Sequence, residues 1–365
     1  MLYLLVAGAR PNLMKIAPVM REFEARSAEC VLVHTGQHYD DEMSGVFFRD
    51  LGLRDPDHHL GVGSGSHGVQ TARVMEAFEP LVEELRPDVV IVVGDVNSTL
   101  GCALVGAKSG ARVAHVEAGL RSRDWTMPEE INRVVTDRVS DYLFAPSPDA
   151  VENLRAEGYT DDRIHLVGNV MVDTLLHSLE RARSRTTVRD LGLDGRRYGL
   201  VTLHRPANVD DPHTLKALLG AFNSIARFLP LVFPVHPRTA ARIATEGVDP
   251  SLIVTPPLGY LDFIALEASA DLVLTDSGGV QEETTVLGVP CLTVRENTER
   301  PITIEQGTNT LVGRDPEVIV AEARRVLREG VPTRRPDLWD GRAAVRIVGV
   351  LMSGVKPPRP TELPA

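Results

Sequence analysis

The chain has 365 residues, which is more than one typical domain needs and enough for two domains that each bury a core. Its composition is 43% hydrophobic and 24% charged, which is typical of a soluble globular protein and excludes a wholly disordered chain. The formal net charge of −11 would repel a phosphate backbone and no basic cluster offsets it, so we expect no nucleic-acid partner.

No apolar run approaches the roughly 20 residues that a membrane-spanning helix needs. The first residues, MLYLLVAGARP, lack the basic start and the length of a signal peptide. We therefore expect a cytoplasmic protein without a membrane partner. Cys30, Cys102 and Cys291 are widely spaced in or beside apolar segments, which favours three buried thiols in a reducing compartment over a disulfide or a metal site.

Short apolar runs alternate with longer helical patterns in the first half of the chain. The predicted strands are Leu2–Val6, Cys30–His34, Val89–Val93, Val113–Val116, Tyr142–Ala145 and Ile164–Val167. Such a series forms a parallel sheet covered by helices on both faces, so we predict an N-terminal Rossmann-like domain over residues 1–180. The polar segment 179–197 interrupts the pattern and is the candidate linker.

A second series of the same kind follows the linker. Its predicted strands are Tyr198–Leu203, Leu231–Val235, Leu252–Val254, Leu272–Thr275 and Cys291–Val294, and its predicted helices are Pro316–Glu329 and Arg342–Met352. We predict a second Rossmann-like domain over residues 190–340, a C-terminal helix at 341–355 that returns to the first domain, and a flexible tail at 356–365. The fold class is therefore α/β, with two doubly wound domains facing a cleft.

Reactive side chains follow nearly every predicted strand, where open parallel sheets bind their ligands. In chain order they are Gly8, Arg10 and Lys15; His34, Gln37 and His38; Asp95 and Ser98; Glu117; His204 and Arg205; His236 and Arg238; and the segment Asp276–Glu283. A helix cap or a packed turn explains any one of them. Seven in sequence point to a single cleft.

The segment DSGGVQEE, Asp276–Glu283, is typical of an anion site at a helix start. We expect Ser277 to cap the helix and Gly278 and Gly279 to let the backbone approach a diphosphate. Glu282 and Glu283, in the predicted first turn, either balance the helix dipole or hold vicinal hydroxyls such as those of a ribose. The cations expected at the same diphosphate are Arg10, Lys15 and Arg205.

A second glycine motif, GSGSHG at Gly63–Gly68, matches the dinucleotide-binding pattern and has Asp88 twenty residues later. The segment before it is a poor strand, so we predict a flexible loop. Metal-binding motifs are also missing from the sequence, and we expect neither a metal nor another cofactor.

Nine motifs, taken together, indicate a relationship to a known family. They are GARPNLMKIAPV, HTGQHYDDEM, GDVNST, HVEAGLR, MPEEINR, LHRPAN, VHPRT, TDSGGVQEE and ENTERP. Together they resemble the non-hydrolysing UDP-N-acetylglucosamine 2-epimerases, from residue 1 to about residue 350. The resemblance implies a glycosyltransferase-B-like fold and interconversion of UDP-GlcNAc and UDP-ManNAc with UDP held by the enzyme. It also implies a UDP-sugar as the ligand and a homodimer as the assembly.

The resemblance also explains the carboxylates. No carbonyl acidifies the proton at C2 of the sugar, so the C1–O bond to UDP must break first or concurrently, giving 2-acetamidoglucal. Asp95, Glu117 and Glu129 match the family's catalytic acids, which would act on opposite faces of C2. An acid after Pro128, such as Glu129, also suits a helix start. Glu117 directly follows a buried strand, where a carboxylate is costly unless it has a partner such as Arg121.

Further residues carry over one by one, each as an implication of the resemblance. Arg10 and Lys15 would meet the diphosphate, and His204 would lie beside it and join the catalytic set. The rest of the predicted UDP-sugar set is Arg205, His236, Ser277, Gly278 and Gly279 for phosphate and its surroundings, Glu283 for ribose, Phe263 for uracil, and Arg300 for the nucleotide or sugar. For Phe263, a plain core aromatic is the alternative.

Two features depart from the family pattern. Many members read H-R-x-E-N where this chain has HRPAN, so Ala207 removes a carboxylate. Bacterial members bind a second UDP-GlcNAc as activator, for which Gln37, His38 and Arg73 are the candidate residues; the allosteric role stays open.

Four alternatives remain on the sequence alone. The substrate could be another UDP-2-acetamido sugar, such as UDP-2,3-diacetamido-2,3-dideoxy-glucuronate, or the enzyme could release free ManNAc. A glycosyltransferase of the same fold would need an acceptor, and a UDP-sugar sensor would bind without turnover.

Overall fold

The structure of the protein, a computed structural model, describes residues 1–37, 47–235, 239–240, 242–243 and 249–357, without the side chain of Arg10. The chain forms two compact units. Unit 1 contains Met1–Leu176 and Asp337–Ala365, and unit 2 contains His177–Pro336. The C-terminal segment therefore belongs with the N-terminal half of the chain.

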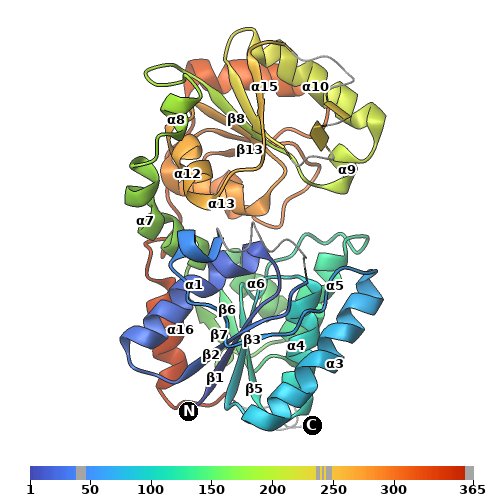
Figure 1. Cartoon of the computed structure of the whole chain (residues 1–365), viewed down its shortest axis with the longest axis vertical. Helices are drawn as coiled ribbons and strands as arrows, with labels where there is room; N and C mark the ends of the chain where they lie inside the picture. Colours follow the sequence, from blue (N-terminus) through green and yellow to red (C-terminus); the bar gives the residue numbers. More distant parts are fainter. Residues whose placement is uncertain (38–46, 236–238, 241, 244–248, 358–365) are drawn as a thin grey trace. The chain divides into compact units, whose positions relative to one another are not determined.

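Unit 1 is built on a seven-stranded sheet in which all the paired strands are parallel (Figure 1). The strands are β1 (Tyr3–Ala7), β2 (Cys30–His34), β3 (His58–His59), β4 (Val89–Val93), β5 (Arg112–Val116), β6 (Tyr142–Ala145) and β7 (Ile164–Leu166). Their order is β3-β2-β1-β4-β5-β6-β7, so the direction of winding reverses between β1 and β4. Such a reversal opens a crevice at the carboxyl ends of the two strands.

Helices cover this sheet. They are α1 (Arg10–Ala25), α3 (His67–Leu85), α4 (Asn97–Lys108), α5 (Pro128–Val139), α6 (Pro148–Ala156), the first half of α7 (Val170–Arg183) and α16 (Ala343–Met352); α7 continues into unit 2 from His177. Helix α4 packs between α3 and α5, and its Cys102 joins Phe78, Val90 and Val92 in the core. Helix α16 packs on α1, where the hydroxyl of Tyr3 donates to the carbonyl of Leu351.

Unit 2 repeats the pattern with a six-stranded parallel sheet of order β10-β9-β8-β11-β12-β13. The strands are β8 (Gly199–Thr202), β9 (Leu231–Pro234), β10 (Leu252–Thr255), β11 (Leu272–Thr275), β12 (Cys291–Thr293) and β13 (Asn309–Leu311). The helices are α8 (Thr187–Asp190), α9 (Pro206–Val209), α10 (Pro212–Ala226), α12 (Tyr260–Ser269), α13 (Gly278–Leu287), α14 (Ile302–Glu305) and α15 (Pro316–Glu329). Here the winding reverses between β8 and β11.

The predicted strands all occur, and no strand end differs from its predicted position by more than one residue. The prediction missed the short edge strands β3 and β13, because two or three residues carry too little pattern to be recognised. The candidate linker 179–197 is partly helical: α7 continues to Arg183 and α8 follows at Thr187–Asp190. The change from unit 1 to unit 2 falls between Leu176 and His177, just before this segment.

Three smaller predictions can also be compared with the structure. The three cysteines are free thiols; Cys102 and Cys291 are buried, but Cys30 is only half-buried, contrary to expectation. Residues 60–66 before α3 form a loop, and Asp88 accepts the backbone N–H of Leu2 at 2.8 Å, as a structural contact. In the part of the chain that the structure describes, no helix has both the length and the apolarity to cross a membrane.

Candidate active site

The ends of β1, β4 and β5 bring a lysine and a glutamate together in unit 1. Lys15, in the second turn of α1, places its Nζ 2.5 Å from Oε2 of Glu117, and both side chains are buried. Gly94 makes room for this pair. A Cβ on Gly94 would lie 2.8 Å from Nζ of Lys15, and its φ of +68° also disfavours any other residue. The sequence is thus adapted to a buried ion pair at the crevice.

Glu117 itself has an unusual backbone conformation. Its φ is +75°, a left-handed value that is rare for a residue with a side chain. The N–H groups of Glu117 and Ala118 both donate to the carbonyl of Phe144, at 3.1 Å each, which holds the chain in this turn. Backbone strain of this kind gathers at functional sites, where the surrounding structure enforces it.

The prediction that Arg121 pairs with Glu117 is wrong. Arg121 instead donates to Asp137 at 2.7 Å and binds Glu157 through two hydrogen bonds of 2.7 Å. The chain turns between Glu117 and Arg121, so the guanidinium points to α5 and α6 while the ammonium of Lys15 reaches Glu117 from α1. Sequence proximity favoured Arg121, whereas the sheet brings Lys15 close from 102 residues away.

The two other predicted acids of unit 1 lie at the start of α4 and α5. Asp95 is partly exposed and binds Nη1 of Arg133 at 2.9 Å. Glu129 is half-buried in the first turn of α5, beside Glu130. Glu130 is buried and accepts the N–H groups of Ser122 and Arg123, so it orders the preceding loop. Of the two adjacent glutamates, Glu130 thus has a structural role.

Sequence reasoning missed a buried pair next to this site, His115 and Asp137. Nδ1 of His115 lies 2.6 Å from Oδ1 of Asp137, and Nε2 lies 2.8 Å from the carbonyl oxygen of Gly94. Burial would raise the pKa of Asp137, but His115 and Arg121 together hold that pKa below its ordinary value. The detectable signal was a histidine inside the apolar strand Arg112–Val116, with no water to solvate it.

In unit 2 the ends of β8 and β11 meet around Asp276. This buried carboxylate accepts the N–H groups of His204 and Arg205 and the amide of Asn208, and it lies 2.8 Å from Nδ1 of His204. Burial would raise the pKa of Asp276, but these partners, led by His204, lower it. Asp276 therefore orients His204, whose side chain is 62% exposed. The prediction of this site named His204 and Arg205 but gave Asp276 no role.

The start of α13 differs from the prediction. Ser277 is the N-cap residue, but its hydroxyl makes no capping bond, and its N–H donates to Oγ1 of Thr275. Gly278 is required by a close approach, since a Cβ there would lie 2.5 Å from Nη1 of Arg300. Glu282 and Glu283 are buried in the second turn rather than the first, so the predicted balance with the helix dipole is wrong.

The predicted UDP-binding side chains of α13 and its surroundings are engaged with each other. Arg300 binds Glu282 at 2.6 Å and Glu299 at 2.5 Å. Burial, with Glu282 adding to it, raises the pKa of Glu283 to about 8, although the hydroxyl of Tyr260 donates to its carboxylate at 3.0 Å.

Phe263 is half-buried and packs against a hydrophobic cluster that includes Leu200 and Val273. The cluster fixes the position of the ring, part of which stays exposed.

The remaining predicted residues are placed as follows. His38, His236, Arg238 and the side chain of Arg10 lie outside the described residues. Gln37 is buried and its Oε1 accepts both the N–H and the hydroxyl of Ser98, which ties the end of β2 to α4. Arg73 is exposed on α3 and donates to the carbonyl of Ser64.

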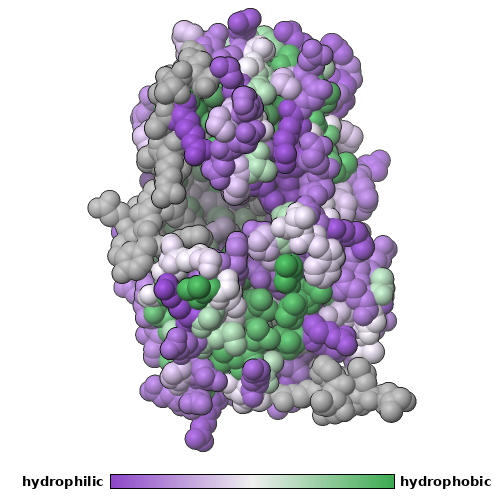
Figure 2. Space-filling view, turned by 90° about the vertical axis from the view of Figure 1, so that its right-hand side faces the viewer, coloured by the Kyte–Doolittle hydropathy of each residue, from purple (hydrophilic) through white to green (hydrophobic). Residues whose placement is uncertain are grey.

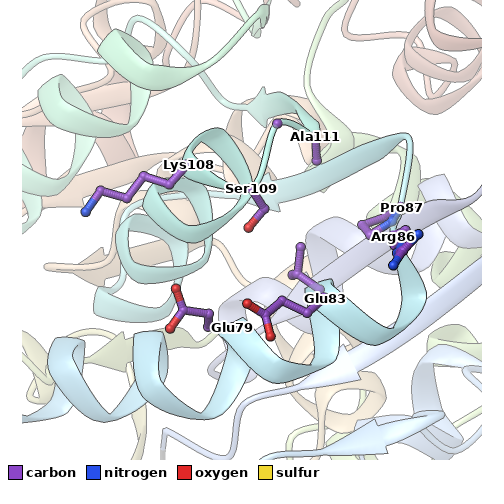
Figure 3. Close-up of a pocket in the computed structure, with 9 residues that line it drawn as sticks. Glu79, Glu83, Arg86, Pro87, Lys108, Ser109 and Ala111 are labelled. Atoms are coloured by element: carbon purple, nitrogen blue, oxygen red, sulfur yellow. The ribbon is translucent and has the colours of Figure 1, made fainter.

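A cavity of about 670 Å³ in unit 1 lies away from all of these residues (Figure 3). Its lining includes Glu79, Glu83 and Lys108, together with Pro87, two residues before β4, and Ala111, directly before β5. The cavity is therefore at the amino ends of the strands, opposite to the side where such sheets bind ligands. Among the described residues, no group of three or more His, Cys, Asp or Glu side chains is arranged to hold a metal ion.

Comparison with known proteins identifies the family. The family model described as UDP-N-acetylglucosamine 2-epimerase matches residues 21–352. A UDP-N-acetylglucosamine 2-epimerase of Methanococcus maripaludis is 40% identical over 364 residues, which is 97% of this chain and 99% of the relative. The chain belongs to the UDP-N-acetylglucosamine 2-epimerase family.

Two further relatives carry the names of different UDP-sugars. A crystal structure of the UDP-GlcNAc 2-epimerase of Methanocaldococcus jannaschii in complex with UDP-GlcNAc and UDP has a TM-score of 0.89 and 41% identity, covering 97% of this chain and 100% of that one. A UDP-2,3-diacetamido-2,3-dideoxy-D-glucuronate 2-epimerase of Pseudomonas aeruginosa is also 41% identical, over 95% of this chain and 98% of the relative. These relatives confirm the predicted family and its glycosyltransferase-B-like fold with two Rossmann-like sheets.

Proposed function

We propose that this protein interconverts UDP-GlcNAc and UDP-ManNAc by epimerisation at C2 of the sugar. The observation that carries the proposal is the likeness, at 41% identity over nearly the whole chain, to an epimerase crystallised with UDP-GlcNAc and UDP. The buried Lys15–Glu117 pair at the crevice of unit 1 supports it, because C2 chemistry requires a positioned carboxylate.

The reaction begins with cleavage of the C1–O bond, whose electron pair leaves with UDP. A carboxylate takes the proton from C2, and the electrons of that C–H bond form the C1=C2 double bond of 2-acetamidoglucal. A second acid returns a proton to the opposite face of C2 as the diphosphate oxygen adds back to C1. Asp95, Glu117 and Glu129 are the residues that we assign to these proton transfers.

Further residues of each unit are assigned to holding UDP. In unit 1 the positive charges of Lys15 and Arg10, and in unit 2 the ring of His204, suit a diphosphate that leaves C1. The N–H groups at the start of α13, from Ser277, Gly278 and Gly279, suit a phosphate. The remaining assignments are Arg205 and His236 near the phosphates, Glu283 for ribose, Phe263 for uracil and Arg300 for the nucleotide or sugar.

Incubation with UDP-GlcNAc in heavy water tests this function. The proton NMR spectrum should show UDP-ManNAc signals, and deuterium should enter C2 of both sugars, without added metal or nicotinamide. A transferase would not exchange the C2 proton, and a sensor would bind UDP without turnover. Lack of both exchange and new sugar would refute the proposal for this substrate.

A second candidate substrate is favoured by a specific observation. The Pseudomonas aeruginosa relative acts, by its name, on UDP-2,3-diacetamido-2,3-dideoxy-D-glucuronate and is as similar as the UDP-GlcNAc epimerase of known structure. The same heavy-water experiment with that sugar distinguishes the two. The preferred substrate is the one with the higher kcat/KM.

We also propose that the protein acts as a homodimer, with the α3 and α5 surface of unit 1 as its interface. Val69 on α3 and Ile131 on α5 are 46% and 42% exposed. Figure 2 shows an apolar area on this side of unit 1. Exposed apolar areas of this kind mark association surfaces.

The variant Ile131→Glu places a charge in the proposed interface and should give a monomer in light scattering coupled to gel filtration. Ile304→Glu changes an equally apolar residue, 39% exposed on α14 of unit 2, and should remain a dimer. A monomeric wild-type protein would contradict the proposal.

A further inference from the structure

The buried His115 occupies an unusual position between two predicted catalytic carboxylates. It is the penultimate residue of β5 and is fully buried. The carbonyl oxygen of Gly94 is only an acceptor, so Nε2 of His115 must donate to it at 2.8 Å. Gly94 directly precedes Asp95. The side chain therefore holds the peptide that carries Asp95.

The other nitrogen of His115 connects to the turn that carries Glu117. Nδ1 lies 2.6 Å from Oδ1 of Asp137, while Oδ2 of the same carboxylate accepts the N–H of Gly119 at 3.0 Å and the guanidinium of Arg121 at 2.7 Å. A carboxylate that receives these donors is ionised, so Nδ1 donates as well. Each ring nitrogen of His115 thus holds one of the two loops: Nε2 binds the Gly94 peptide, and Nδ1 acts through Asp137 on the turn at Gly119.

The backbone around these contacts leaves little freedom. The N–H of Gly94 donates to the carbonyl of Val116 on β5, and the carbonyl of Gly94 accepts from His115 on the same strand. Both backbone groups of Gly94 are therefore held by β5. Gly119 has a φ of +84° and lies against the carbonyl of Ala150. Asp137 thus connects, through one carboxylate, the two loops on which the proton-transfer groups stand.

We propose that His115 and Asp137 are positioning residues that set the separation of Asp95 and Glu117. The inference rests on the proposed function and deepens it. Neither residue has to touch the sugar. Proton transfer to and from C2 requires both carboxylates within hydrogen-bond reach of one carbon, and a displacement of about 1 Å can cost roughly 100-fold in rate.

Two substitutions of His115 separate its contacts. In His115→Gln the side-chain amide nitrogen can replace Nε2 as the donor to the Gly94 carbonyl, but the hydrogen bond to Asp137 is lost. In His115→Asn the amide nitrogen can replace Nδ1 as the donor to Asp137, but the hydrogen bond to the Gly94 carbonyl is lost. Both variants, and Asp137→Asn, should lower kcat by about 10- to 100-fold while the KM for UDP-GlcNAc changes less than about threefold. Release of free UDP per turnover should rise, because the misplaced acid returns the proton too slowly.

The matched control is Asp141→Asn. Asp141 is also a buried carboxylate that binds a strand residue and an arginine, Val113 and Arg112, but at the opposite end of β5. This variant should lose a comparable amount of thermal stability and keep the wild-type kcat and UDP release. Variants of His115 and Asp137 that behave like Asp141→Asn would overturn the proposal.

Amide hydrogen exchange of the ligand-free protein tests the positioning without any turnover. In Asp137→Asn, the amides of residues 94–97 and 117–121 should exchange at least about tenfold faster than in the wild type. In Asp141→Asn, their exchange rates should stay at the wild-type values. Unchanged exchange in Asp137→Asn would refute the role, whatever the substrate. If the wild type itself puts no deuterium into C2 of UDP-GlcNAc, the proposed function fails, and this exchange pattern still decides the positioning role.

Discussion

Glu117 combines three costs that a structural residue has little reason to bear. Its carboxylate is buried, its backbone is left-handed, and its charge requires the equally buried Lys15. Left-handed backbone costs on the order of 1–2 kcal/mol for a residue with a side chain. Taking a carboxylate out of water costs several kcal/mol more, which the attraction of Lys15 has to offset. These costs are reasonable where the carboxylate must take a proton from carbon.

The variant Glu117→Gln should lower kcat for epimerisation by about 10²- to 10⁴-fold, the usual range for loss of a general acid or base. The amide has the same shape but cannot accept the C2 proton. UDP binding, measured by calorimetry, should stay within a few fold of the wild type. The exposed Glu152→Gln on α6 provides the control; an active Glu117→Gln would remove Glu117 from the mechanism.

At the scale of elements, the turns after the strands decide the geometry of the site. The turn between β4 and α4 needs Gly94 for two reasons, its φ of +68° and the ammonium of Lys15 above it. At the corresponding turn of unit 2, Asp276 binds the backbone that follows β8. In both units, a buried charged residue thus lies where the winding of the sheet reverses: Lys15 in unit 1 and Asp276 in unit 2.

The variant Gly94→Ala should lose about 1–2 kcal/mol of stability from backbone strain and also lose activity, because its Cβ displaces Lys15. Gly110→Ala is the matched control. Gly110 has a φ of +84° but open space around its Cβ position, so this variant should be destabilised similarly and remain active. Thermal unfolding and kcat, measured on both, check the prediction; equal activities would contradict it.

At the scale of the whole molecule, the C-terminal segment is part of unit 1. The carboxylate of Asp173 in α7 accepts the N–H groups of Ala343 and Ala344 at the start of α16, 170 residues later. Trp339 is buried nearby and donates to the carbonyl of Pro146. The chain thus leaves unit 1, forms unit 2 and returns, which ties the folding of the first half to the last residues.

The contact between Asp173 and the start of α16 predicts that stability depends on pH. Burial raises the pKa of Asp173 from 3.8 to about 6, although the two backbone N–H groups oppose it. The folded state therefore holds its proton more tightly than the unfolded state, so this contribution to stability is full below about pH 4 and is lost as the pH rises toward 6. The difference in unfolding free energy between wild type and Asp173→Asn should fall by on the order of 3 kcal/mol across this window.

Urea unfolding at several pH values checks that slope. The control is Asp340→Asn near the start of α16, since the hydrogen bond from Arg346 lowers the pKa of Asp340. Between pH 4 and 6 its difference from the wild type should therefore stay nearly constant, and the stability that Asp340 contributes should be lost only as the pH falls below about 4. A constant difference for Asp173→Asn between pH 4 and 6 would contradict the prediction.

The sequence by itself determined the two βα series, their strands and the residues that follow them, because apolar runs and turn residues act over a few neighbours. Its motifs also determined the family. Only the tertiary structure decided which charged groups meet: Lys15 rather than Arg121 with Glu117, Asp137 with His115, and Asp173 with α16. These pairs lie between 22 and 170 residues apart. A buried charge is stable only beside its partner, and the partner is chosen by strand order and helix packing, which no local pattern encodes.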